Sequence, residues 1–190
     1  MSWSTRSFEC ALVFIVLCEL RPAWFTGMEL QLQGVEQISG TELIDADGLR
    51  IMKFNRTLAV MNGTIHITRD IGDLFEFRIS VAYSRIGNNQ FVEYPMKIAK
   101  ENVCKVLNGP YREYQYLWAN TTNFPQVAPE ERLCPLPKGW YWIKNYAPDA
   151  AWVPSVVPEG LWRMTLDILD VGGDIQCQFR SYTWLRKPII

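Results

Sequence analysis

Few residues in this chain are of the types that carry out catalysis. The only histidine is His66, so there is no second histidine for a metal-ligand pair, and no base–nucleophile pair is evident. The carboxylates Glu130-Glu131 and Asp167 with Asp170 could form the acid pair of a glycosidase, but nothing distinguishes them from ordinary surface charge. A Gly-rich phosphate loop and a nucleophile elbow are both absent from the sequence. We therefore expect a protein that is not an enzyme and that uses no metal or cofactor.

The cysteines are the other reactive residues. Beyond the N-terminal segment there are three, Cys104, Cys134 and Cys177, which allow at most one internal disulfide. We predict a bond between Cys104 and Cys134, because it would staple a helical excursion of the chain to the sheet. Cys177 shares an apolar strand face with Ile175 and Phe179, so we predict a free, buried thiol there.

The N-terminus predicts an export signal over residues 1–26. Arg6 precedes an apolar run at residues 11–18, which Glu19 and Arg21 end. This run is shorter than the roughly 20 apolar residues of a membrane span. A buried N-terminal strand is the alternative, but the run does not alternate as a half-buried strand would. The cleavage site is left open. We expect residues 27–190 to form one secreted domain in an oxidising compartment, with no transmembrane segment after signal removal.

Charge and sequons add to this description of the mature chain. The net charge is -1 and there is no basic run, so we expect no nucleic-acid partner. Three Asn-x-Thr triplets begin at Asn55, Asn62 and Asn120. Behind an export signal they predict surface glycosylation. Asn62 is expected on an exposed strand face together with His66.

The elements that must position these residues are mostly strands. Residues 75–83 alternate strictly, with Phe75, Phe77 and Ile79 on one face, as in a sheet with one buried side. Residues 103–118 have helical spacing, which Asn108-Gly109-Pro110 should break into two short pieces. Together the patterns predict a mainly β fold: an immunoglobulin-like β-sandwich or β-cup of seven or eight antiparallel strands with a short helical insert.

Several short motifs, taken in order, carry a resemblance to a known family. They are Arg69-Asp70-x-Gly72-Asp73-x-Phe75-Glu76-Phe77, Tyr94-Pro95, Val103-Cys104-Lys105, Thr122-Asn123-Phe124-Pro125, Cys134-Pro135-Leu136-Pro137-Lys138-Gly139-x-Tyr141 and Pro158-Glu159-Gly160-x-Trp162-Arg163. The chain resembles the insect CheA and CheB chemosensory proteins, which are related to the ganglioside-activator branch of the lipid-recognition β-cup superfamily. The likeness covers about residues 30–184. The paired cysteines of the family map onto Cys104 and Cys134, although ganglioside activators carry more disulfides than this chain allows.

The resemblance implies a secreted, non-enzymatic carrier that holds a lipid or another hydrophobic ligand, such as a cuticular pheromone, between two splayed sheets. A chemosensory receptor is a further partner that it implies. The expected inner wall consists of Phe75, Phe77, Ile79, Val81, Met164, Leu166 and Ile168. We expect the loop 121–132, with Phe124 and Val127, to run over the surface and form a movable portal; a plain connection is the other interpretation.

Two alternatives to the carrier stay open. The first is a secreted module with a solid core that acts by binding a receptor or another secreted protein. The second is a degenerate glycosidase-like enzyme. An apolar void between the sheets would favour the carrier, because ligand sites are mostly apolar cavities of several hundred cubic ångströms.

Overall fold

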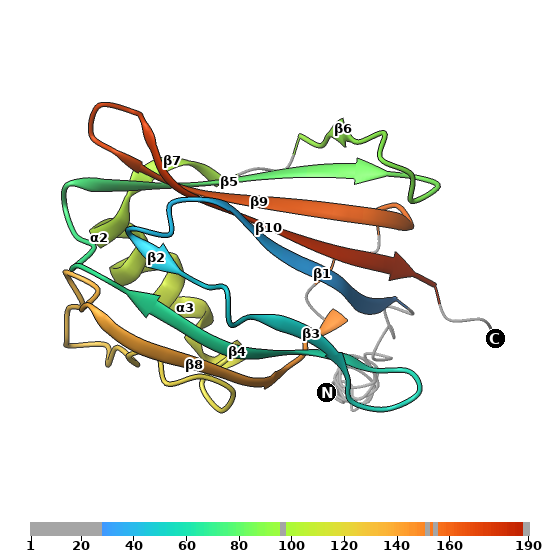
Figure 1. Ribbon diagram of the computed structural model, residues 1–190, viewed down its shortest axis with the longest axis horizontal. Helices are drawn as coiled ribbons and strands as arrows, with labels where there is room; N and C mark the ends of the chain where they lie inside the picture. The colour runs from blue at the N-terminus through green and yellow to red at the C-terminus, as the bar shows by residue number, and fades with distance from the viewer. Residues whose placement is uncertain (1–27, 96–97, 151–152, 154–155, 188–190) are drawn as a thin grey trace, which may run out of the picture.

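The computed structural model describes residues 28–95, 98–150, 153 and 156–187, and the predicted export signal lies outside them. Ten strands form two antiparallel sheets, seen as an upper and a lower layer in Figure 1. The predicted mainly β sandwich with a helical insert is confirmed. The number of strands exceeds the predicted seven or eight, because the prediction missed very short edge strands. β2 (Ile44–Asp45) and β6 (Val92–Glu93), for example, have only two residues each. Segments this short carry no readable alternation.

The larger sheet has the order β1-β10-β9-β5, with β6 and β7 (Ile98–Asn102) both pairing with β5. Its long strands are β1 (Glu29–Ser39), β5 (Phe75–Ser84), β9 (Gly160–Asp170) and β10 (Ile175–Arg186). The register between β5, β9 and β10 runs without a shift from the Phe77–Ile168 pair to the far ends of the strands. Side chains that face one another across these strands therefore lie on the same side of the sheet.

The smaller sheet is centred on β4 (Ala59–Ile67). One side of β4 pairs with β2 and β3 (Arg50–Lys53), and the other side pairs with β8 (Gly139–Tyr146). The free edge of β8 is covered by the chain just after the helical insert. There the backbone N–H of Lys144 donates to the carbonyl of Thr121 (2.7 Å), and that of Trp142 donates to Oδ1 of Asn123 (2.6 Å). A covered edge removes a site for unwanted strand pairing.

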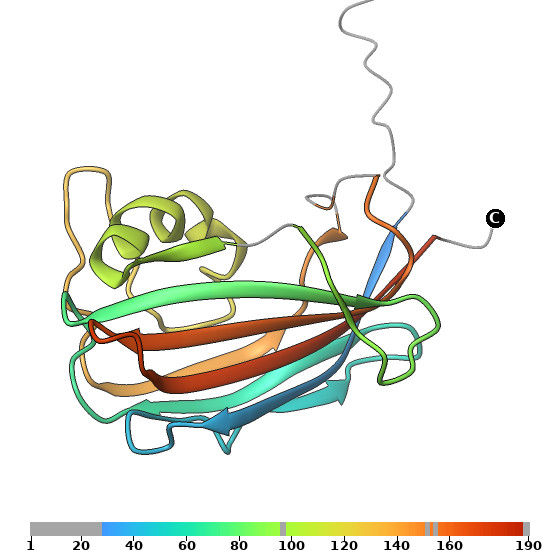
Figure 2. The ribbon, with the colours of Figure 1, turned by 90° about the horizontal axis from the view of Figure 1, so that it is seen from above.

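The helical insert lies beside the sandwich, near the N-terminal end of β5 (Figures 1 and 2). It consists of α2 (Val103–Val106), a π turn η1 (Leu107–Tyr111), α3 (Arg112–Tyr114) and a 3-10 turn η2 (Gln115–Leu117). The side-chain oxygen of Asn102 caps its start by accepting the backbone N–H of Cys104 at 2.9 Å. Such capping satisfies one of the free N–H groups at a helix start.

The predicted break at Asn108-Gly109-Pro110 is wrong. Backbone angles stay helical on both sides of Pro110, which lies inside the π turn. Proline lacks an N–H and its ring crowds the Cβ of the preceding residue, but Gly109 has no Cβ and nothing surrounds that position within 4 Å. Asn108 adds a tertiary anchor, because its side chain donates to the Leu133 carbonyl and accepts the Leu133 N–H (3.0 and 2.9 Å). Glycine and this anchor let the helical run continue.

Candidate functional site

The structure gathers the seven predicted inner-wall residues on one face of two adjacent strands. Six of them are direct cross-strand partners, and Phe75 occupies the next position on the same face. The pairs are Phe77–Ile168, Ile79–Leu166 and Val81–Met164. The strict alternation of inward and outward side chains in β5 and β9 is sufficient to place these seven residues on one face.

This face is turned toward the smaller sheet. The ladder continues into β10, where Cys177 lies opposite Ile168 and Phe179 opposite Leu166. Cys177 is completely buried and belongs to a core cluster that also contains Ile67 and Tyr141 of the smaller sheet. The seven residues therefore line the interior of the sandwich and not its surface.

The interior has two separate core clusters. The first lies near the helical insert and comprises Leu43, Ile44, Ile67, Ile71, Phe75, Val103, Leu107, Tyr141, Ile168 and Cys177. The second lies at the other end of β9 and β10 and comprises Met28, Val153, Val157, Trp162 and Leu185. The middle of the inner wall falls between them.

Exposure rises along the inner wall from the first cluster toward this middle region. Phe75 and Ile168 are each 7% exposed, whereas Ile79, Val81 and Leu166 are half-buried. Met164 points inward and is nevertheless 41% exposed. Leu166 packs against the first cluster and Val81 against the second, which leaves Met164 as the most exposed residue of the wall.

Sequence reasoning missed two polar residues of the same wall. Ser181 lies opposite Met164, and Thr183 lies opposite Trp162. The sequence pattern predicted a strand over residues 175–180 only, but β10 continues to Arg186 with the same alternation. Extending the period-two pattern through Leu185 would have identified both hydroxyls as inward-facing.

The loop 121–132 packs against the helical insert and the smaller sheet. Val127 is 3% exposed, and its backbone N–H and carbonyl both bond to the side-chain amide of Gln115 (2.7 and 2.9 Å). The ring of Phe124 stacks on Tyr141, with centroids 4.6 Å apart. Asn123, Gln126 and the segment 128–132 are exposed, as expected for a surface loop. The middle of the loop is held in place by these contacts.

Tyr141 anchors this region to the smaller sheet. Its hydroxyl donates to the carbonyl of Pro137 at 2.6 Å. Burial, followed by the negative charge of Asp70, raises the pKa of the Tyr141 hydroxyl. Tyr141 therefore stays a neutral hydrogen-bond donor that fixes the start of β8.

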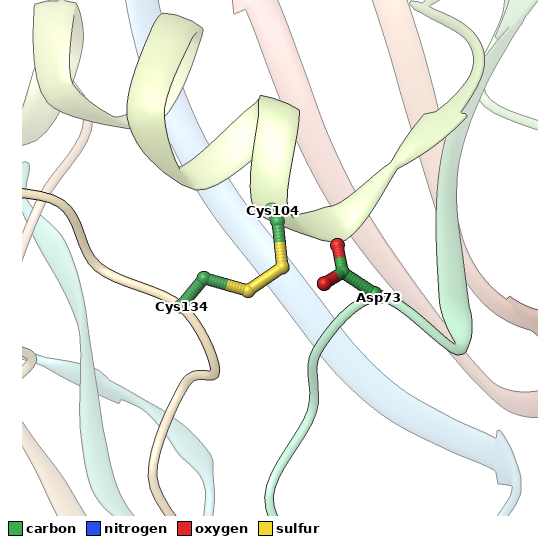
Figure 3. Close-up of side chains that lie close together, drawn as sticks. All are labelled: Asp73, Cys104 and Cys134. Atoms are coloured by element: carbon green, nitrogen blue, oxygen red, sulfur yellow. A yellow bond between two sulfur atoms is a disulfide. The ribbon is translucent and has the colours of Figure 1, made fainter.

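The predicted Cys104–Cys134 disulfide is present, with the two Cα atoms 5.3 Å apart, and Cys177 is a free buried cysteine. The carboxylate of Asp73 lies close to the two sulfurs, within 4.8 Å (Figure 3). Metal binding by cysteine requires thiolates, and these sulfurs are bonded to each other. The disulfide instead ties the start of the helical insert to the segment that leads into β8.

His66, Asp167 and Asp170, three of the residues considered for catalysis, have partners within the fold. The imidazole of His66 stacks on the indole of Trp140, with centroids 4.2 Å apart. Asp167 is 2% exposed and forms an ion pair with Arg78 at 2.6 Å on the outer side of the larger sheet. Asp170 accepts the backbone N–H of Asp174 in the β9–β10 turn. These contacts hold the imidazole and the two carboxylates in place within the fold.

The three sequons lie in different surroundings. Asn55 and Asn120 are exposed, in the β3–β4 loop and just after the helical insert. Asn62 is half-buried, whereas we expected it to be exposed; its Oδ1 accepts the backbone N–H of Asn145 at 3.0 Å. Asn55 and Asn120 therefore offer the more accessible acceptor positions.

Two pockets occur on the described part of the chain. One of about 190 Å³ lies between β1 and the β2–β3 turn, and Val35, Leu49 and Phe179 are among its lining residues. The other, of about 310 Å³, lies on the outer side of the larger sheet near Phe91, Tyr182 and Trp184. Neither is lined by the seven predicted wall residues.

The fold is thus an antiparallel β-sandwich with a helical insert that a disulfide fastens in place. Residues 77–164, from β5 to the middle of β9, match a family model described as "Protein of unknown function (DUF1091)". The matched segment includes the helical insert and both cysteines of the disulfide. No curated protein matches the chain. In the part of the chain that the structure describes, no helix has the length and apolar character needed to cross a membrane.

Proposed function

We propose that this chain is an exported, non-enzymatic binding protein that carries a lipid or another hydrophobic ligand between its two sheets. The observation that carries the proposal is Met164, which faces the interior and is 41% exposed. A soluble protein gains free energy by covering such apolar surface, about 25 cal/mol per Å². A bound apolar ligand would supply this cover.

The surroundings of Met164 support an apolar ligand. Its neighbours on the wall are Val81 and the half-buried Ile79 and Leu166, and buried clusters lie on both sides. Ligand sites in proteins are mostly apolar, with a few polar groups that orient the ligand. The resemblance to the CheA and CheB proteins supports a role in chemosensation, with a pheromone-like ligand.

Export is part of the proposal. A disulfide is typical of proteins that fold in an oxidising compartment, and Asn55 and Asn120 are exposed sequon residues. In a secreted carrier, the loop 121–132 would control access to the wall. Because Val127 is buried, exchange through this loop would require a transient opening.

The proposal is tested by native mass spectrometry of protein secreted from insect cells, combined with displacement of a fluorescent fatty-acid probe. Met164→Trp should fill the open part of the wall and abolish the co-purified lipid. Val171→Trp is the matched control, because Val171 is 66% exposed in the β9–β10 turn. Wild-type protein that neither retains lipid nor binds the probe would contradict the proposal.

One observation favours a second candidate, a protein-interaction module. Trp140 and Trp142 alternate with the buried Tyr141, so they lie on the outer face of β8, and they are 67% and 41% exposed. Exposed indoles are common at protein interfaces. This candidate predicts a partner whose capture is lost in Trp140→Ser plus Trp142→Ser and unaffected by Met164→Trp.

A further inference from the structure

Two hydroxyl groups stand on the open part of the inner wall. The run Cys177, Phe179, Ser181, Thr183 and Leu185 occupies one face of β10, since the register with β9 has no shift along it. Both ends of the run lie in the core, with Cys177 in one cluster and Leu185 in the other. Ser181 and Thr183 must therefore point between the sheets as well.

These hydroxyls have no side-chain hydrogen-bond partner among the residues that the structure describes. Neither Ser181 nor Thr183 makes a side-chain hydrogen bond with any described residue. Neither oxygen is among the buried polar atoms that lack a partner, and both residues are half-buried. The hydroxyls are thus accessible in the same open region that exposes Met164.

The three strands that carry the wall direct no charged side chain inward around these hydroxyls. We consider the part of β5 from Phe77 to Tyr83 and the residues of β9 and β10 that lie opposite it. Every charged side chain there is on the outer face of the sheet; these residues are Arg78, Arg163, Asp167 and Arg180. Residues of the smaller sheet that pack toward the interior, such as Ile65 and Tyr141, are also uncharged. A carboxylate or ammonium group placed here would lose its hydration without gaining an ion-pair partner.

We infer that the site selects a neutral amphiphile, a long-chain alcohol or ester whose uncharged oxygen atoms bond to Ser181, to Thr183 or to both while its chain covers Ile79, Val81 and Met164. A hydroxyl both donates and accepts, so it suits an alcohol or an ester carbonyl. The two residues are two positions apart on one strand, about 7 Å, so an alcohol oxygen bonds to one hydroxyl and the two oxygens of an ester can reach both. This inference rests on the proposed carrier function and specifies its ligand class.

The test compares three probes of equal chain length, cetyl alcohol, palmitate and hexadecane, each displacing a fluorescent naphthylamine dye. The wild-type protein should bind cetyl alcohol about tenfold more tightly than hexadecane and more tightly than palmitate at neutral pH, since one good hydrogen bond is worth about 1 kcal/mol or more. Ser181→Ala plus Thr183→Val removes both hydroxyls and keeps the side-chain shapes. In this variant the affinity for cetyl alcohol should fall to that for hexadecane, which itself should not change.

Thr165→Val is the matched control, because Thr165 lies on β9 at an outward position opposite Ser80 and Arg180. It should leave all three affinities unchanged. If the wild type and the double variant bind cetyl alcohol equally well, or if palmitate binds best, the inference on ligand class is wrong and the carrier function stands. If the wild type binds neither the dye nor any probe, both are wrong.

Discussion

The side-chain amide of Gln37 on β1 contacts the thiol of Cys177 on β10, with 3.7 Å between Nε2 and Sγ. The same amide nitrogen donates to the carbonyl of Ile44, and its oxygen accepts the backbone N–H of Ala46 at 2.9 Å. Gln37 thus links the larger sheet to the chain around β2 of the smaller sheet. Cys177 lies directly behind this link and has no exposed surface.

We predict that Cys177 does not react with thiol reagents in the native protein. Burial raises the pKa of the Cys177 thiol to about 12, and only the thiolate is nucleophilic. In the unfolded chain the thiol ionises near its usual pKa of about 8.5. The folded state therefore holds the proton more tightly, and its stabilising effect is lost as pH rises from about 9 toward 12. Thiol titration with and without denaturant checks the first part, and Cys177→Ala should flatten the loss of stability over that pH range.

The disulfide should make a large contribution to stability. Cys104 and Cys134 are 30 residues apart, and closing a loop of this size is worth roughly 3 to 4 kcal/mol in the chain-entropy description. Replacing both by Ser should lower the free energy of unfolding by this amount, measured by urea titration. Wild-type protein under reducing conditions should behave like the variant, and the variant should not respond to reductant. Equal stability with and without the bond would contradict the prediction.

The Arg78–Asp167 pair should matter far more than an exposed pair. Asp167 is almost fully buried and also accepts from Gln178 at 2.7 Å. Arg78→Ala would leave a buried carboxylate without its cation, so we expect a loss of about 3 kcal/mol. Glu101→Gln, which removes the exposed partner of Lys105, should cost much less, because solvent screens this pair. Chemical denaturation of the two variants compares them directly, and equal losses would show that burial of Asp167 has no effect.

Gly40 should tolerate no side chain. Its φ is +87°, and an added Cβ would lie 2.2 Å from the carbonyl oxygen of Gln176 and 2.5 Å from the Cα of Cys177. Backbone atoms cannot move aside as a flexible side chain can, so Gly40→Ala should cost about 2 kcal/mol or more. Gly34→Ala in β1 is the control, because its Cβ would meet only Tyr182 at an ordinary 3.7 Å. Thermal melts should show a lowered Tm for Gly40→Ala alone.

The buried loop residue Val127 should control both stability and ligand exchange. Val127→Ser places a hydroxyl in an apolar site and should cost about 2 kcal/mol. If the loop covers the mouth of the cup, release of a fluorescent fatty-acid probe should also become faster in stopped-flow experiments. Gln126→Ser, an exposed neighbour, serves as the control. A destabilised variant with unchanged release rates would make the loop a plain connection.

Much of the architecture follows from local sequence patterns. Alternation over residues 75–83 and in β9 placed Phe77, Ile79, Leu166 and Met164 correctly on one inner face, because a strand reverses its side chains at every residue. The cysteine count limited the pairing, and Cys104–Cys134 formed while Cys177 stayed free. Each of these features depends on residues close in the chain or on simple counting.

Other features were decided only by tertiary structure. The helical run passes through Pro110 because Gly109 leaves space and Asn108 bonds to Leu133, a residue distant in sequence. Val127 is buried because Gln115 of the insert holds its backbone. Periodicity gives the face on which Met164 and Ser181 lie, but their exposure depends on how closely the opposite sheet approaches. That distance is set by the packing of the two core clusters at the ends of the sandwich, and a one-dimensional pattern carries no information about it.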